Sequence, residues 1–182
     1  MSRPELDDPD RLAVELVTRC AQRGLTLGAA ESLTGGLLTE RLVRVPGASA
    51  VVRGAVVAYA PGVKRAVLGV PERVLQEHGT VSRACAEAMA AGARRVLGSD
   101  LAIATTGVAG PDPSEGHPVG TVHLAVQMRD ADGEEVHAQR ALMLCGSRPE
   151  IREKTVCAAL VLALRTLPGA PPSTEAGDRG VP

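Results

Sequence analysis

The chain has 182 residues, of which 45% are hydrophobic and 23% are charged, and its formal net charge at pH 7 is −1. The length suits a single domain with a buried core, and the near-neutral charge argues against a nucleic-acid or membrane-surface partner. Tyr59 is the sole aromatic residue, which excludes the usual base-stacking platform of single-strand binders.

The two ends of the chain differ in composition from its middle. The opening "MSRPELDDPD" is acidic and has no apolar core, so it does not resemble a signal peptide. No apolar run approaches the ~20 residues that span a bilayer, and we therefore expect a cytoplasmic protein. The predicted organisation is an N-terminal extension over residues 1–9, one domain over 10–167, and a disordered, low-complexity tail over 168–182.

The first half of the chain alternates between helical and strand-like patterns. Apolar residues at helical spacing predict a helix over residues 9–23, and "LTLGAAE" predicts a short buried strand after it. A second helix is predicted over 34–45, where Pro46-Gly47 ends it. The segment from 48 to 60, which is apolar and rich in β-branched residues, predicts another strand.

The middle of the chain is predicted to be helical. Short helices are expected over residues 63–69 and 72–78, and a longer helix over 82–97 with Ser82 as its N-cap. "DLAIATTG", from 100 to 107, is the clearest buried strand.

The last third predicts a hairpin and a closing helix. After a Gly- and Pro-rich loop, strands are expected over 121–129 and 135–144, joined by an Asp-Gly turn within 130–134, and a helix over 148–166. Alternating helices and buried strands followed by a hairpin predict an α/β fold, a three-layer α/β/α sandwich with a mixed sheet.

The cysteines do not suggest a metal site. None forms a CxxC pair or lies at ligand spacing from a histidine, so we expect no metal and interpret all four as buried, reduced thiols. They are Cys20, Cys85, Cys145 and Cys157.

Two loops at predicted strand ends share hydroxyl residues followed by glycines. They are "ESLTGG" and "TTGVAGP". Glycines let backbone N–H groups approach a ligand, and a helix N-terminus adds partial positive charge, so the pair suits an anion such as phosphate. The alternative is that Ser32 or Thr34 only caps the next helix and the glycines only turn the chain.

The segment "AYAPGVKRAVLGV" offers a base for a serine nucleophile. No histidine is well placed for that role, whereas a lysine can serve if it is neutral. Lys64 lies in an apolar segment whose desolvation would lower the lysine pKa, and Tyr59 would orient the lysine or pass on a proton. The alternatives are that Lys64 is a solvated helix residue and Tyr59 fills core volume.

Five sequence blocks occur in order along the chain. They are "AESLTGG", "VVRGAVVAYAPGVKRAVLGV", "HGTVSRACAEAMAAGA", "DLAIATTGVAGPDPSEGHPVGTVHLAV" and "GSRPEIRE". Together they resemble the C-terminal domain of the CinA family, the nicotinamide-nucleotide amidohydrolases, over about residues 10–167.

The resemblance implies a hydrolase that converts nicotinamide mononucleotide to nicotinic acid mononucleotide and ammonia, in pyridine nucleotide salvage. It implies Ser32 as nucleophile, Lys64 as general base and Tyr59 as an assisting residue, with neither cofactor nor metal. Relatives also suggest a homo-oligomer. The residues expected to contact the nucleotide are Thr34, Gly35, Gly36, Thr106 and Gly107, with Arg148 or Arg152 on its phosphate.

Some positions depart from the family pattern. Leu33 replaces a cysteine, and the loop "GPDPSEGHPVG" carries Pro113 and has His117 in place of a lysine. The larger N-terminal domain often found in relatives does not precede the module here, so a standalone version is expected. Two other hypotheses stay open: a non-catalytic nucleotide-binding or regulatory module of this competence/damage-inducible family, and an amidase for another small amide.

Overall fold

Residues 8–129, 133 and 135–168 are described by the computed structural model. The predicted turn at 130–134, apart from Gly133, lies outside the described residues, as do most of the predicted N-terminal extension and tail. Five strands form one sheet in the order β2-β1-β3-β4-β5. They are β1 (Leu27–Glu31), β2 (Val52–Val57), β3 (Leu101–Gly107), β4 (Thr121–Arg129) and β5 (Glu135–Met143).

The sheet is mixed, as predicted. β1 pairs in parallel with both β2 and β3, while β4 runs antiparallel to β3 and to β5. Consequently the carboxyl ends of β1 and β3 lie at the same edge of the sheet, which is where open α/β sheets place their ligands.

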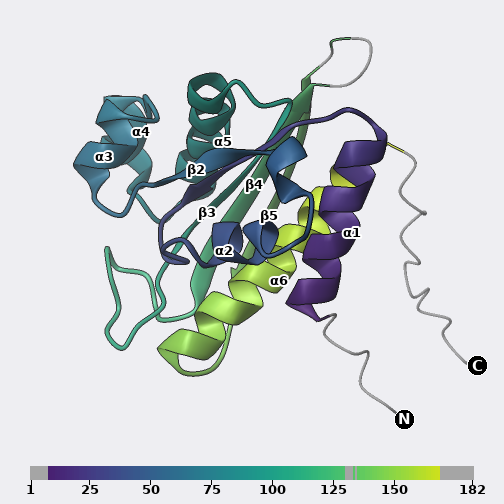
Figure 1. Cartoon of the computed structure of the whole chain (residues 1–182). Coiled ribbons are helices and arrows are strands. Elements are labelled where there is room, and N and C mark those ends of the chain that lie inside the picture. Colours follow the sequence, from purple (N-terminus) through teal and green to yellow (C-terminus); the bar gives the residue numbers. More distant parts are fainter. Residues whose placement is uncertain (1–7, 130–132, 134, 169–182) are drawn as a thin grey trace, which may run out of the picture.

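Helices cover both faces of the sheet and complete the predicted three layers (Figure 1). On one face α1 (Pro9–Gln22) and α6 (Arg148–Thr166) pack side by side, with α2 (Leu37–Val43) next to them. The other face is covered by α5 (Arg83–Leu97), accompanied by the short helices α3 (Pro61–Ala66) and α4 (Glu72–His78). Both cores consist of small and aliphatic side chains, as the lack of aromatic residues requires.

Two predicted elements differ from the structure. The strand expected over 48–60 is a short 3-10 helix at Ala48–Ala50 followed by β2, because the β-branched run begins only at Val51. The helix expected from residue 34 begins at Leu37. Gly35 and Gly36 have φ values of 59° and 95°, which a continuing right-handed helix does not allow.

The remaining helices lie close to their predicted ranges. Ser82 caps α5 as predicted, since its hydroxyl accepts the amide of Cys85 at 3.1 Å. α3 begins two residues earlier than expected, at Pro61, because proline suits the first position of a helix.

The prediction of four buried thiols is wrong for two of them. Cys20 and Cys85 are buried, whereas Cys145 is exposed in the connection after β5 and Cys157 is half-buried on α6. No helix within the described ranges is long and apolar enough to cross a membrane.

Candidate active site

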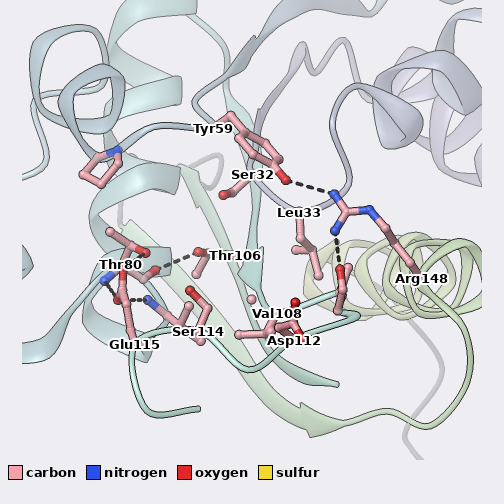
Figure 2. A pocket seen from close by; sticks show the side chains of 15 residues that line it. Ser32, Leu33, Tyr59, Thr80, Thr106, Val108, Asp112, Ser114, Glu115 and Arg148 are labelled. Carbon is pink, nitrogen blue, oxygen red and sulfur yellow. Dashed lines mark hydrogen bonds between the residues drawn. The ribbon is translucent and has the colours of Figure 1, made fainter. Parts of the chain in front are cut away.

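A pocket of about 280 Å³ opens at the edge of the sheet where β1 and β3 end. Ser32 follows β1 directly, and Thr106 and Gly107 close β3. All three line the pocket, as do Tyr59 and Arg148 (Figure 2). The fold therefore brings most of the chemistry-bearing residues singled out in the sequence to one place.

Ser32 and Lys64 are in direct contact. The Lys64 Nζ lies 2.9 Å from the Ser32 Oγ and also donates to the carbonyl of Ala58 at 2.6 Å. Lys64 is only 1% exposed and Ser32 only 8% exposed. The alternative of a solvated helix residue is therefore excluded for Lys64.

Burial lowers the pKa of the Lys64 amine below its ordinary value, because the interior disfavours the charged form. Cys85, in its ionised form only, and the Glu115 carboxylate act in the opposite direction and raise the same pKa to a smaller extent; burial raises the pKa of the Cys85 thiol itself to about 11. The net lowering increases the fraction of neutral amine, which is the form that can take a proton from a hydroxyl.

Tyr59 lies at the mouth of the pocket and is 60% exposed, so it does not fill core volume. Its hydroxyl accepts a hydrogen bond from Arg148 Nη2 at 2.9 Å, while Arg148 Nη1 donates to the carbonyl of Gly110 at 2.6 Å. Arg148 thus links Tyr59 to the loop that follows β3; Figure 2 shows its bond to the Tyr59 hydroxyl. The hydroxyl contacts Arg148, and neither Lys64 nor Ser32 is bonded to it within the described structure.

The turn after Ser32 is held by a buried carboxylate. Glu31, which is 0% exposed, accepts the backbone amides of Gly36, Leu38 and Thr39 and the Thr39 hydroxyl. It therefore satisfies the N-terminus of α2, where neither Ser32 nor Thr34 acts as a cap. The sequence predicted that this glycine-rich helix start would receive a ligand anion, but Glu31 already occupies it.

One amide of the same turn stays available beside the pocket. The Ser32 amide donates to Thr105 and the Gly35 amide donates to the Ser32 carbonyl. Among the described residues, the amides of Leu33 and Thr34 make no backbone hydrogen bond, but only Leu33 lines the pocket, whereas Thr34 is fully buried. The Leu33 amide is therefore the donor of this turn that remains for a negatively charged oxygen formed next to Ser32.

Arg152 contacts the turn from its other side. Its Nε and Nη2 donate to the carbonyl of Thr34 at 3.2 Å and 2.6 Å, and the Thr34 hydroxyl lies 2.7 Å from that of Thr105. Of the seven predicted nucleotide contacts, Thr106, Gly107 and Arg148 line the pocket. Thr34, Gly35, Gly36 and Arg152 do not line it; they form or hold the turn behind it.

Sequence reasoning missed one wall of the pocket. Thr80 and Val81, from the connection before α5, and Asp112, Ser114 and Glu115, from the loop before β4, also line it. Their only sequence signals were the "HGTVSRA" block and the unusual composition of "GPDPSEGHPVG". Within the described ranges, no group of three or more His, Cys, Asp or Glu side chains could hold a metal ion.

The sequence of this chain matches a known protein family. Residues 9–167 match the family described as the CinA C-terminal domain. A CinA-like protein from Frankia casuarinae is 50% identical over 159 residues, which cover 86% of this chain and 36% of that protein. The chain thus spans about a third of the length of the curated relatives it matches.

Solved structures agree in fold. The competence/damage inducible protein CihA from Agrobacterium tumefaciens is 38% identical with a TM-score of 0.80, covering 91% of this chain and 99% of that one. A CinA superfamily protein from Escherichia coli is 28% identical with a TM-score of 0.82, covering 92% and 95%. Sequence and fold together show that the chain belongs to the CinA C-terminal domain family.

Proposed function

We propose that this domain is an amidohydrolase that deamidates nicotinamide mononucleotide to nicotinic acid mononucleotide and ammonia. The observation that carries the proposal is the 2.9 Å contact between the Ser32 hydroxyl and the buried Lys64 amine. A serine is a weak nucleophile until a neighbouring base takes its proton, and a neutral amine at this distance can do so.

The proposed reaction has two halves. Lys64 takes the Ser32 proton as Oγ attacks the carboxamide carbon, and the oxyanion is stabilised by the amide of Leu33. The Lys64 ammonium then gives its proton to the leaving nitrogen, so that ammonia departs and an acyl-enzyme remains. Water, activated by the same amine, releases the carboxylic acid and restores Ser32.

Arg148 supports a phosphate-bearing substrate. Among the described residues it is the single cationic side chain lining the pocket, whose lining also carries the carboxylates of Asp112 and Glu115, and it stands at the mouth beside Tyr59. A phosphate there would lie at the open side, away from the Ser32–Lys64 pair, and arginine binds phosphate with well-oriented donors. The carboxamide end would then enter the pocket first.

The test is ammonia release from nicotinamide mononucleotide by the purified protein. Wild type is expected to release ammonia and produce nicotinic acid mononucleotide. In Ser32→Ala and in Lys64→Met we expect kcat to fall at least about 10³-fold. Ser49→Ala, which changes an exposed serine, is the control and is expected to retain activity. Full activity in Ser32→Ala would contradict the mechanism. Saturable binding without turnover in wild type would instead favour a non-catalytic nucleotide-binding module, and turnover of other amides only would favour a different amidase.

A further inference from the structure

One wall of the pocket is a loop that reaches over to the α4–α5 connection. Residues 108–120 connect β3 to β4, and Val108, Gly110, Asp112 and Glu115 of this loop line the pocket. Arg148 holds the loop at Gly110. Arg148 fixes only the part of the loop at Gly110, so the position of the part around Glu115 depends on other contacts.

The far end is held by the carboxylate of Glu115. Its Oε2 accepts the amides of Thr80 at 2.7 Å and Val81 at 3.4 Å, and its Oε1 accepts the Thr80 hydroxyl at 2.7 Å. Figure 2 shows Glu115 and Thr80 joined at the side of the pocket opposite Arg148. These bonds connect segments 35 positions apart in the sequence.

Both partners are shaped for this contact. Gly79 has a φ of 74°, and a Cβ added there would lie 2.7 Å from Glu115 Oε2, so a side chain at position 79 would displace the carboxylate. Glu115 itself has a φ of 51° and is the only non-glycine residue with positive φ in the described part of the chain. Glycine would adopt that backbone more readily, which indicates that the side chain of Glu115 matters there.

The contact continues to the strand that carries the site. The carbonyl of Thr80 accepts the Thr106 hydroxyl at 2.7 Å, and both residues line the pocket. Burial of the Glu115 carboxyl raises its pKa, but the hydrogen bonds from Thr80 and Val81 outweigh this effect, and its pKa lies below the ordinary value. The carboxylate is therefore charged at neutral pH, and its bonds are charge-assisted.

We propose that Glu115 is a positioning residue: its carboxylate latches loop 108–120 onto Thr80 and Val81 and thereby fixes the pocket wall against which the substrate binds. Glu115 does not touch the reacting atoms in this proposal. Its role toward the substrate rests on the amidohydrolase function proposed above, whereas the latch itself is a property of the free protein. The two parts are therefore measured separately.

The first experiment measures hydrogen exchange of the Thr80 and Val81 amides by NMR in wild type and in Glu115→Gln. Loss of the charged acceptor is expected to speed exchange of both amides about tenfold or more. Glu77→Gln is the matched control, because Glu77 is an exposed glutamate outside the pocket lining. Unchanged exchange in Glu115→Gln would overturn the latch whatever the activity of the protein.

The second experiment measures kcat and KM for nicotinamide mononucleotide in Glu115→Gln, in Thr80→Val and in the double variant. A latch that shapes the binding wall raises KM about tenfold and makes the two substitutions clearly non-additive. Because the Glu115 charge also raises the pKa of Lys64, kcat is compared on the high-pH plateau, where Lys64 is neutral in every variant, and it stays within about threefold there. Unchanged or lowered KM together with faster exchange would overturn the role in binding. If wild type releases no ammonia, the proposed function fails, and the exchange result still decides whether the latch exists.

Discussion

Glu31 provides the sharpest test of how the nucleophile is held in place. In Glu31→Gln one carboxylate oxygen becomes an NH2 group inside a fully buried site. Oε2 receives the amides of Gly36 at 2.9 Å and Leu38 at 3.1 Å, and Oε1 receives the Thr39 amide at 2.8 Å. Whichever way the new amide turns, its NH2 faces at least one backbone N–H group, and that group loses its acceptor.

The smaller loss arises when the NH2 faces Thr39, because the Thr39 hydroxyl can then turn and accept a hydrogen bond. One charge-assisted bond of about 1.5–3 kcal/mol disappears, and the bonds from Gly36 and Leu38 weaken by about 1 kcal/mol each. We therefore expect the free energy of unfolding to fall by about 4 kcal/mol, a large share of the roughly 5–15 kcal/mol typical of a domain.

Urea unfolding followed by circular dichroism measures this change as a lower midpoint at an unchanged m-value. Glu40→Gln is the matched control, since Glu40 makes a surface pair with Arg44 one helical turn on and should contribute about 0.5 kcal/mol. A loss below about 1 kcal/mol in Glu31→Gln, similar to that of the control, would refute the reasoning that this carboxylate anchors the turn after Ser32.

Burial lowers the pKa of Lys64, and only the neutral amine is a base, so kcat/KM should rise with pH and level off below the ordinary lysine pKa of about 10.4. A pH profile whose midpoint lies at or above that value would contradict a lowered Lys64 pKa. Arg152→Ala should lower kcat about tenfold by releasing the Thr34 carbonyl, whereas a rise in KM alone would make Arg152 a phosphate ligand. Gly92→Ala should lower the free energy of unfolding by about 2 kcal/mol or more, measured as a lower urea midpoint, because the new Cβ would lie 2.1 Å from the Leu68 carbonyl oxygen. Gly62→Ala is the control and should leave the midpoint unchanged, because there is open space around Gly62.

Much of the fold could be predicted because local patterns and tertiary packing agree. In α5, for example, the apolar stripe, the Ser82 cap and the terminal Gly98 all indicate the same boundaries. The prediction failed at Ser32–Gly36, where hydroxyls before glycines resembled a helix start. The residue that satisfies the helix is Glu31, which reaches forward from the strand, and the spacing of capping residues gives no sign of it.

The candidate site could be predicted where each residue belongs to a strand end, as Ser32 and Thr106 do. It could not be predicted where long-range contacts decide a role. Arg148 and Arg152 are one helical turn apart on α6, yet Arg148 lines the pocket and Arg152 binds the Thr34 carbonyl behind it. That difference depends on the rotation of α6 against the sheet, which no local pattern in "GSRPEIRE" specifies.

Lys64 departs from the usual pattern of burial, in which apolar side chains lie inside and lysines lie at the surface. It is the one buried residue of α3, while Val67, directly after the helix, is 42% exposed. Burying an amine and exposing a valine opposes the hydrophobic effect, so this arrangement lowers stability unless the amine is neutral and bonded. Its partners, the Ser32 hydroxyl and the Ala58 carbonyl, compensate part of that loss. Buried ionisable side chains occur most often at functional sites, so the contact between Lys64 and Ser32 is the first place to search for function.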